Sequence, residues 1–339
     1  MNLTVSFSGD EYTATVVVNG TTQTAYRPTV SINNYTPTHY VATTGSDSNN
    51  GASPGTAWRT IGKACATVVP GNVVKVMNGV YDEFPRLTTS GTVGSPIVFF
   101  AERIGGVKIQ PTGTKTVTNQ SGQPIIADGA VWGMSSVNYV TLDGFAMVGY
   151  KDLAWVESAY IALGFLGSGG QTAVQTWGER YGANGLAWDG GGIGCKIPNC
   201  TFANNLHCGV KSLAHGSSGW AIDSCLAFLN GTQNTDHGIY CPDDNVTARG
   251  NVLFGNSGWA LHWYSNPQNG SINRNVSYNN GAGGMLMEGG NNTIENNTFY
   301  ENQTTSSNMS SLFRGSTCSG NLYRKNILHV GVGSGFGYG

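Results

Sequence analysis

One short phrase recurs along the second half of the chain and restricts what the chain can fold into. The phrase has the form Asn, any, any, aromatic, any, Asn, and its copies lie between residues 199 and 331. The closing positions, which follow one another in steps of 26, 26, 24, 22 and 29 residues, are 204, 230, 256, 280, 302 and 331. Self-similarity at a period of roughly 20 to 50 residues is typical of a solenoid, in which each repeat packs only on its neighbours.

Aligning the copies places the same kinds of side chain in columns. The first column holds Cys200, Leu226, Val252, Val276, Thr298 and Ile327. The second lies two residues on and holds Phe202, Phe228, Phe254, Tyr278, Tyr300 and His329. The third lies three residues before the phrase and holds Ile222, Ala248, Ile272, Ile294 and Tyr323. A spacing of two residues indicates strands with the first two columns on one side, and the frequent Gly and Asn residues disfavour helical repeats.

The closing Asn of each phrase indicates how one strand turns into the next. Asn tolerates the left-handed backbone region better than any residue except Gly, so it suits a sharp turn. When it is stacked once per repeat, its amide group can also bond to the copies above and below. We therefore predict an all-β fold, a single-chain parallel β-helix with rungs about 4.8 Å apart.

Composition sets further limits on the function. Only 11% of the 339 residues are charged and the net charge is −2, so no basic surface favours nucleic-acid binding. The longest apolar stretch, 153–166, contains Glu157 and is too short to cross a membrane. The seven cysteines show no Cys-x-x-Cys spacing, and we expect no disulfides and most of the thiols to be buried. The first residues lack a basic segment followed by an apolar one, so we expect no signal peptide.

The chain divides into two regions and one interruption. Residues 1–37 alternate polar and apolar side chains around an Asn19-Gly20 turn, which predicts a small β appendage. Residues 38–339 form the predicted β-helix. Regular phrases fail between residues 149 and 192, and a long irregular excursion from a solenoid is usually functional or an interface.

The start of the second region carries a family resemblance. It contains a Gly-Ser-Asp-Ser-Asn-Asn-Gly loop at 45–51, a short helix expected at 56–69 with Trp58 on its apolar face, and Pro70-Gly-Asn-Val-Val and Gly79-Val-Tyr phrases. This succession resembles the entry segment of pectate-lyase-like β-helix proteins, a superfamily that includes polysaccharide lyases, epimerases and phage tailspikes. The resemblance implies a right-handed β-helix whose N-terminal helix caps the first coil. It also implies a polysaccharide partner, an extracellular or virion-associated location and, for a tailspike-like protein, a homotrimer.

The second strand of each rung is where chemistry is expected. Its inward residues are predicted to be Val210, Ile239, Leu261, Met285 and Leu312. The next residue must then face outward, and that column reads Lys211, Tyr240, His262, Leu286 and Phe313. Lys, Tyr and His on one outer face fit β-elimination from an acidic glycan, which needs a cation at the uronate carboxylate, a base and an acid. We predict Lys211 or Arg314 as the cation, His237 or His262 as the base and Tyr240 as the acid; an epimerase would use the same groups.

Substrate binding and the alternatives complete the prediction. Aromatic and acidic residues near this face suit sugar binding, and the candidates are Trp177, Trp188, Trp263, Tyr264 and Glu288. A glycoside hydrolase would instead use paired carboxylates, for which Asp236, Asp243 and Asp244 are available. A third alternative is a non-catalytic glycan-binding or structural virion protein. We expect no cofactor, because no acidic column of the kind that binds calcium in pectate lyases is present.

Overall fold

The structure is a computed structural model, and it describes residues 2–8, 11–18, 21–26, 32, 34–110, 116–118, 124–126, 130–148, 184–205, 207–212, 217–300, 302, 312–314, 318–329 and 337–338. For the strands within 2–26, 116–118, 124–126, 312–314 and 337–338 the description covers the backbone alone. Most of the predicted insertion, including Trp177, therefore lies outside the described residues, as does the closing Gly331 of the last phrase.

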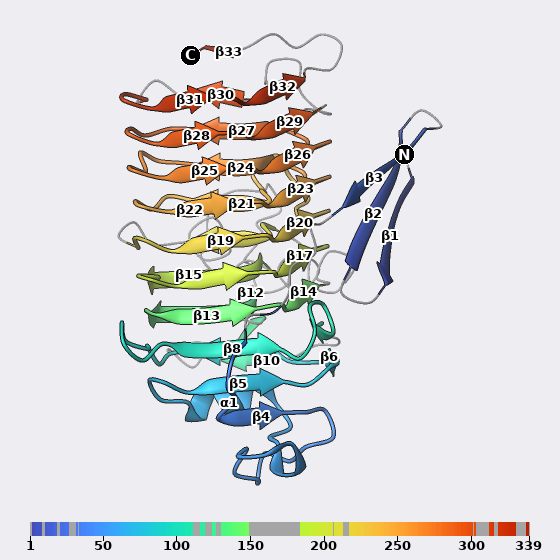
Figure 1. Ribbon diagram of the computed structural model, residues 1–339, viewed down its shortest axis with the longest axis vertical. Coiled ribbons are helices and arrows are strands. Elements are labelled where there is room, and N and C mark those ends of the chain that lie inside the picture. Colours follow the sequence, from blue (N-terminus) through green and yellow to red (C-terminus); the bar gives the residue numbers. More distant parts are fainter. Residues whose placement is uncertain are drawn as a thin grey trace.

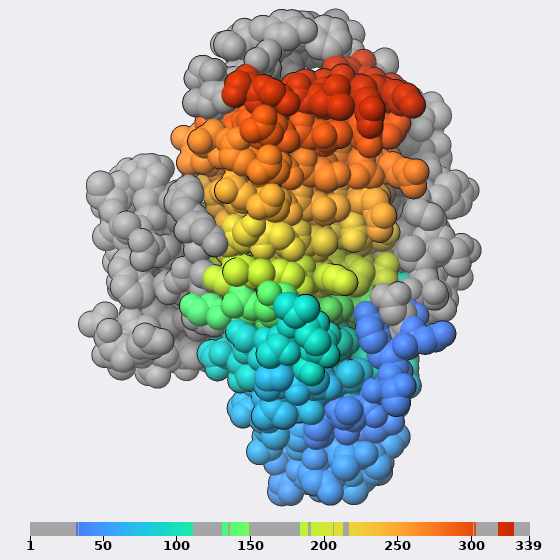
Figure 2. Space-filling view, turned by 60° about the vertical axis from the view of Figure 1, so that its left-hand side comes forward, coloured from blue at the N-terminus to red at the C-terminus, as the bar shows by residue number. Residues whose placement is uncertain are grey.

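From His39 onward the chain winds as a right-handed parallel β-helix, as the sequence predicts. Each rung contributes one strand to each of three parallel sheets, which run the length of the molecule (Figure 1). Figure 2 shows the described rungs as level bands stacked in chain order, from blue near the N-terminus to red near the C-terminus.

Sheet I consists of β4 (His39–Val41), β5 (Val73–Val76), β8 (Ile97–Ala101), β13 (Val140–Asp143), β16 (Lys196–Pro198), β19 (Ala221–Asp223), β22 (Thr247–Arg249), β25 (Ser271–Asn273), β28 (Thr293–Glu295) and β31 (Leu322–Arg324). Sheet II consists of β6 (Gly79–Tyr81), β9 (Val107–Ile109), β14 (Ala146–Val148), β17 (Thr201–Ala203), β20 (Leu226–Phe228), β23 (Val252–Phe254), β26 (Val276–Tyr278), β29 (Thr298–Tyr300) and β32 (Ile327–His329). Sheet III consists of β7 (Arg86–Leu87), β12 (Ala130–Val137), β15 (Asn184–Gly191), β18 (Val210–Ser212), β21 (Ile239–Cys241), β24 (Trp259–Trp263), β27 (Gly283–Met287), β30 (Leu312–Arg314) and β33 (Gly337–Tyr338).

Two small antiparallel sheets are not part of these three parallel sheets. The N-terminal sheet comprises β1 (Asn2–Ser8), β2 (Glu11–Val18) and β3 (Thr21–Tyr26), in agreement with the predicted hairpins. The second pairs β10 (Thr116–Thr118) with β11 (Pro124–Ile126). The predicted insertion ends earlier than residue 192, because β15 is a regular strand that pairs with both β12 and β18.

The capping helix is present but shorter than predicted. A 3₁₀ turn, η1 (Pro54–Thr56), precedes α1 (Ile61–Thr67), which begins after Thr60. The Thr60 side chain accepts a hydrogen bond from the Lys63 amide, which fixes the helix start. Trp58 lies before α1, in extended backbone bridged to Val41, and packs into the core with Ile61. The helix lies beside β4 at the first coil and places apolar residues on the core (Figure 1).

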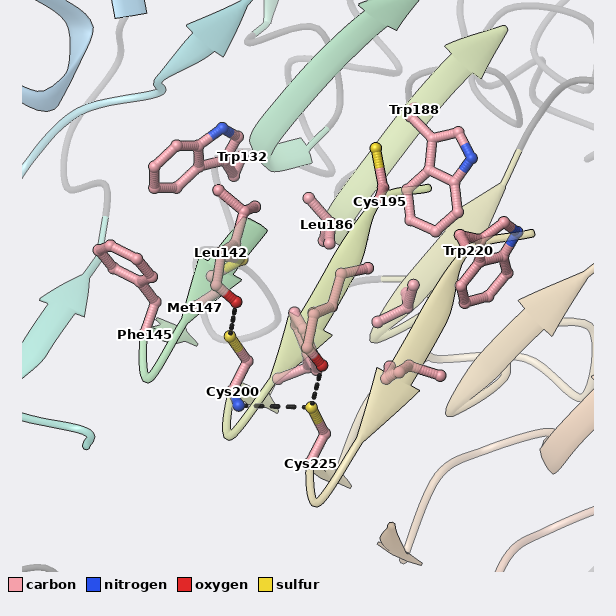
Figure 3. Close-up of a cluster of buried hydrophobic side chains, with 14 of the residues drawn as sticks. Trp132, Leu142, Phe145, Met147, Leu186, Trp188, Cys195, Cys200, Trp220 and Cys225 are labelled. Carbon is pink, nitrogen blue, oxygen red and sulfur yellow. Dashed lines mark hydrogen bonds between the residues drawn. The ribbon is translucent and has the colours of Figure 1, made fainter. Parts of the chain in front are cut away.

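The interior of the stack is apolar, because period-two alternation turns one column of each sheet inward. The predicted column from Ile222 to Ile294 is in register and fully buried. Figure 3 shows the core around Trp132, Phe145 and Trp188, where the Cys200 thiol donates to the Leu142 carbonyl group at 3.3 Å. All seven cysteines are free and buried, as predicted.

The predicted asparagine ladder lies buried at the turn between sheets II and III, with two corrections. Its members, joined by amide-to-amide hydrogen bonds of 2.8–2.9 Å, are Asn205, Asn230, Asn256, Asn280 and Asn302. The first member is thus Asn205 and not Asn204. At the first four ladder positions the left-handed residue is the one before, for example Asn204 at φ 56° and Asn279 at φ 54°. One residue therefore makes the backbone turn, and the next residue makes the ladder hydrogen bonds.

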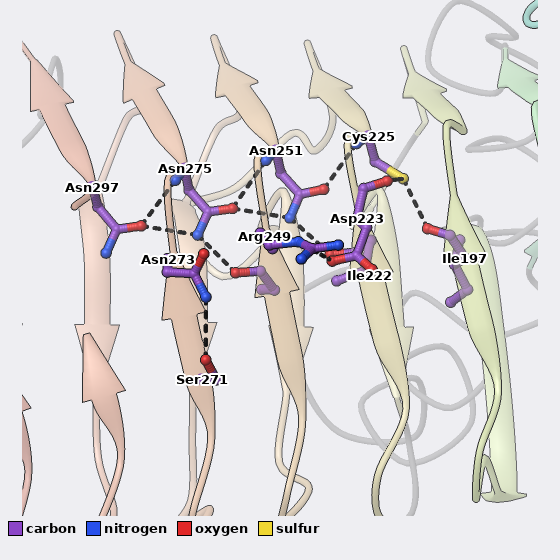
Figure 4. A network of polar contacts seen from close by, with 11 residues as sticks. Ile197, Ile222, Asp223, Cys225, Arg249, Asn251, Ser271, Asn273, Asn275 and Asn297 are labelled. Carbon is purple, nitrogen blue, oxygen red and sulfur yellow. Dashed lines mark hydrogen bonds and ion pairs between the residues drawn. The ribbon is translucent and has the colours of Figure 1, made fainter. Parts of the chain in front are cut away.

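A second ladder, which the sequence analysis missed, lies at the turn between sheets I and II. It runs through Asn251, Asn275, Asn297 and Asn326, and each amide group also donates to a backbone carbonyl of the preceding rung. Cys225 occupies the same position one rung earlier, and its thiol donates to the Ile197 carbonyl group at 3.1 Å (Figure 4). The opening Asn of the repeated phrase was the signal for this ladder.

The aromatic column faces away from the interior. Strand pairing aligns Ala203 with Phe228, so Phe202 and Cys200 were each assigned one residue out of register. The rings of Phe228, Phe254 and Tyr278 stack on the outer face of sheet II with centroids 4.9 Å apart. These rings belong to a second, smaller apolar cluster, which is separate from the main core inside the stack. Among the described residues, no helix is long and apolar enough to span a membrane.

Candidate functional site

Sheet III places a polar column on its outer face, and its register is the predicted one. Lys211 on β18 pairs with Tyr240 on β21, which pairs in turn with His262 on β24. The preceding residues Val210, Ile239 and Leu261 are fully buried in the core, so alternation directs the polar column outward. Leu286 and Phe313 continue the backbone register on β27 and β30. We refer to Lys211, Tyr240, His262 and their neighbour His237 as the outer cluster.

The members of the outer cluster lie close together. The Lys211 Nζ atom is 5.5 Å from the centroid of the Tyr240 ring, within range of a cation–π contact. The Tyr240 and His262 rings meet edge to face with centroids 5.3 Å apart. One cation, one phenol and one imidazole therefore share a half-buried surface that spans three successive rungs.

His237 joins the cluster from the loop before β21. Its Nδ1 atom accepts a hydrogen bond from the Trp259 backbone N–H group at 3.0 Å, and its Nε2 atom lies 2.6 Å from His262 Nδ1. The side chain of His237 is nearly fully buried, while His262 is half-buried. The two imidazole rings thus form a chain from the backbone to the outer face.

An interruption of the repeat builds this loop. In neighbouring rungs the outer-column residue lies six positions after the ladder Asn, as His262 does after Asn256. Tyr240 instead lies ten positions after Asn230. The next rung holds both ends of the longer segment, because Ser257 N–H donates to Asn230 O at 2.9 Å and Gly258 N–H to Asp236 O at 2.6 Å. The extra residues therefore bulge from the stack and bring His237 over β24.

The loop packs so closely on the next rung that only glycine fits at position 258. A Cβ atom at Gly258 would lie 2.5 Å from His237 Nδ1 and 2.5 Å from the Asp236 carbonyl oxygen. Such distances are far inside van der Waals contact, so any larger residue would displace the loop. Gly258 therefore permits the hydrogen bond between Trp259 and His237.

The environment keeps both histidines neutral. Burial lowers the pKa of His237 well below its ordinary value, and the neighbouring His262 and Lys211 lower it further. Burial lowers the pKa of His262 to about 3, with Lys211 adding to the effect. Desolvation disfavours the charged imidazolium, and a cation nearby disfavours it again. The fixed positive charge in the outer cluster is therefore that of Lys211.

Two predicted binding residues lie beside the cluster. Tyr264 follows β24, is 42% exposed and has its ring centroid 5.3 Å from that of His262. Glu288 follows β27 in the next rung, and its amide group donates to Trp263 O at 2.8 Å. Partial burial raises the pKa of the Glu288 carboxyl group. Both residues border the outer face at the ends of their strands.

Two predicted sugar-stacking residues are wrong, because their side chains lie in the interior. Trp188 is 1% exposed and packs edge to face on Trp220, with ring centroids 4.7 Å apart (Figure 3). Trp263 is fully buried in the same core. Trp263 lies two residues after the inward Leu261, so the alternation already implied its direction. Neither indole ring can reach a ligand outside the stack.

Arg314 is placed by its backbone only. It pairs with Met287 and shares that register with Trp263, whereas the outer column of the same strand passes through Phe313. The described members of the Arg314 column, Trp263 and Met287, are buried in the core. The register therefore separates Arg314 from the column of Lys211.

The three candidate carboxylates belong to separate local networks. Asp236 accepts hydrogen bonds from the Thr232 and Gln233 backbone N–H groups at 2.9 Å each, and it lies 2.8 Å from His207 Nδ1. Burial alone would raise the pKa of Asp236, but the hydrogen bonds from His207 and the loop amides hold it below its ordinary value. Asp236 therefore stabilises the bulged loop that carries His237.

Asp243 and Asp244 have different partners. Asp243 is buried, and its side chain accepts hydrogen bonds from the Ser212 hydroxyl group and from Trp220 Nε1. Asp244 is exposed and accepts from the Gln268 backbone N–H group at 2.7 Å. The pair does not form two facing carboxylates in one network. In the part of the chain that the structure describes, no group of three or more His, Cys, Asp or Glu residues is arranged to hold a metal ion.

Sheet order, rung geometry and stacked asparagines define a right-handed parallel β-helix protein. Residues 184–339 match the family model for the right-handed β-helix region. No curated protein matches the sequence.

Three solved structures illustrate the likeness. The ORF18 protein of Geobacillus virus E2 is 12% identical with a TM-score of 0.53, and the match covers 89% of this chain and 57% of that one. Pectate lyase Pel9A is 17% identical with a TM-score of 0.46, covering 86% and 77%. Pectin methylesterase PemA from Erwinia chrysanthemi is 11% identical with a TM-score of 0.48, covering 87% and 94%. At 12% identity the likeness to the phage protein establishes the fold alone, and this chain spans little more than half of that protein.

Proposed function

We propose that the protein acts on an acidic polysaccharide at the outer cluster of sheet III, by β-elimination or by epimerisation at the carbon beside a carboxylate. One observation carries this proposal: Lys211, Tyr240 and His262 stand in one outward column on adjacent strands, with His237 bonded behind them. Exposed columns of a solenoid need no such chemistry for folding, because their side chains do not enter the core.

The reaction needs few groups, and the outer cluster contains them. Removal of the C5 proton of a uronate leaves an electron pair that forms the C4–C5 double bond while the C4–O bond breaks. The leaving oxygen then takes up a proton, so no water or redox partner is consumed. The Lys211 ammonium group would neutralise the carboxylate and so lower the pKa of the C–H bond. Tyr240, between Lys211 and His262, would act as the phenolate: its oxygen would take up the C5 proton and then donate it to the leaving C4 oxygen, which regenerates the phenolate.

Epimerisation would use the same first step. The carbanion would take a proton from water on the opposite face instead of expelling the C4 oxygen, and Tyr240 would return its proton to the solvent, so the chain would stay intact. Both outcomes require a cation beside the carboxylate and a group that exchanges a proton with the adjacent carbon. A polymer substrate is favoured because the column continues along the stack through Leu286, with Tyr264 beside it. Action on such a polymer fits an extracellular or virion-associated protein.

The test is turnover on a panel of uronic-acid polymers. An unsaturated product absorbs ultraviolet light, and epimerisation in deuterated water incorporates deuterium at C5. We expect Tyr240→Phe to abolish either reaction and Lys211→Met to weaken it strongly. The matched control is Tyr300→Phe, which removes the same hydroxyl group from the exposed outer face of sheet II. Full turnover by Tyr240→Phe would refute the proposed role, and binding without turnover by the wild type would leave a glycan-binding protein.

A further inference from the structure

The two histidines of the outer cluster form a hydrogen-bonded chain whose polarity can be worked out. The Trp259 backbone N–H group is a donor only, so His237 Nδ1, 3.0 Å away, must be unprotonated. A neutral His237 then carries its proton on Nε2, which lies 2.6 Å from His262 Nδ1. That nitrogen must accept, so a neutral His262 carries its own proton on Nε2.

Other proton arrangements leave a clash or an orphaned group. If His262 carried its proton on Nδ1, that proton would face the Nε2–H group of His237 across 2.6 Å. If His237 carried its proton on Nδ1, that proton would point at the Trp259 N–H group, and two donors would face each other. Burial and the Lys211 charge also disfavour an imidazolium at either ring.

The groups around His262 determine which ligand atoms can contact its outward nitrogen, Nε2. Lys211 on β18 is a cation, Tyr240 on β21 and Tyr264 after β24 are phenols, and the neighbour on β27 is the apolar Leu286. Within the described residues, the His262 side chain has no hydrogen-bond partner besides His237. An N–H group beside an ammonium group suits an anionic oxygen that accepts from both.

We propose that His237 is a positioning residue that locks His262 as the Nε2–H tautomer, so that His262 and Lys211 together bind a carboxylate oxygen of the ligand. This inference rests on the proposed function for the identity of the ligand, but the lock itself does not. It also divides the roles in the reaction. A locked His262 cannot take up a proton at its outer nitrogen, so proton transfer falls to Tyr240, and the prediction of His237 or His262 as the base is replaced by a donor role.

The lock is tested without any activity. Long-range ¹H–¹⁵N correlation spectra of uniformly labelled protein distinguish the two tautomers of each histidine. We expect wild-type His262 as the Nε2–H tautomer, with no titration through the ordinary histidine pKa of about 6.5. In His237→Phe the ring should populate both tautomers and titrate, and His237→Gln, which can still donate to His262, should restore the lock in part. A wild-type His262 that titrates near 6.5, or that carries Nδ1–H, would overturn the lock.

The ligand is tested in the same spectra. Oligogalacturonate is the probe, and its methyl ester, which lacks the negative charge, is the control. We expect the His262 Nε2 resonance to shift with the acid and to stay unchanged with the ester. Equal shifts with both would overturn the carboxylate contact. A locked His262 that responds to no uronic-acid oligosaccharide would refute the proposed function and leave the lock standing, so the two failures are distinguishable.

Discussion

Replacement of Asn256 by alanine tests whether the buried ladder holds the rungs in register. The Asn256 amide group makes four hydrogen bonds: it donates to Ala227 O and Asn280 Oδ1, and accepts from the backbone and side-chain nitrogens of Asn230. Its donors and lone pairs are all used. Alanine would remove all four bonds, while Asn280 Oδ1 would still accept from the Asn256 backbone N–H group and Asn230 Nδ2 would still donate to Phe202 O.

The magnitude follows from this count. A buried group left without a partner costs about 1–3 kcal/mol, and the loss of one bond from a group that keeps another costs about 0.5–1.5 kcal/mol, so a dry cavity would cost about 3–9 kcal/mol. A water molecule in the space of the amide group could restore about three of the four bonds. We therefore expect Asn256→Ala to lower the free energy of unfolding by about 3–5 kcal/mol, a large part of the ordinary stability of roughly 5–15 kcal/mol.

The assay is urea unfolding followed by circular dichroism, with Asn273→Ala as the control. Asn273 lies on the outer face of sheet I, where the one hydrogen bond of its side-chain amide to a described residue goes to Ser271 at 3.2 Å, so its loss should cost within about 0.5 kcal/mol. If the two variants unfold within about 1 kcal/mol of each other, the reasoning is refuted. In the second ladder Asn251→Cys should be milder than Asn251→Ala, because Cys225 already replaces an Asn there and keeps a donor to the backbone.

Two further predictions concern the interior and the histidines. Trp263→Ala should destabilise the fold by about 3–5 kcal/mol in urea unfolding, because the indole ring is fully buried; loss of glycan binding with unchanged stability would contradict the core placement. The pKa values of His237 and His262 are lowered in the folded state, so below pH ~6.5 the unfolded chain binds protons that the folded chain does not. Stability should therefore fall as the pH drops from about 6.5 toward the folded pKa of His262 of about 3, by up to about 1.4 kcal/mol per pH unit for each histidine. The double variant His237→Gln, His262→Gln should show a flatter dependence of the urea midpoint on pH.

Much of the fold could be predicted from sequence because period-two alternation is a strict geometric rule. Once Val210, Ile239 and Leu261 are assigned to the interior, the next residue of each strand must face outward, and the observed pairing of Lys211, Tyr240 and His262 agrees. The same rule applied two residues later would have placed Trp263 in the core. Trp263 was assigned to sugar binding from its residue type alone, although its strand directs the side chain inward.

The register slip at Asn204 has a different cause. Two consecutive asparagines, Asn204 and Asn205, both suit the turn, and sequence alone does not separate the left-handed position from the bonding position. A one-residue slip moves every side chain of a strand to the other face, so Cys200 and Phe202 were misassigned with it. The hydrogen bond between the two histidines was also beyond sequence, because it depends on a loop whose path no repeat predicts.

That loop suggests where chemistry arises on a repetitive fold, and a deletion can test it. Residues 231–234 are the excess of the Asn230 rung, and both ends of the segment are held by Ser257 and Gly258. Removing these four residues would restore the six-residue spacing of the neighbouring rungs, so the ladder and the core should survive with a urea midpoint near that of the wild type. Asp236 would lose the amide groups of Thr232 and Gln233, and His237 its support over His262. We expect His262 to titrate in this variant and turnover to vanish; a folded variant whose His262 stays locked would show that the loop does not position the site.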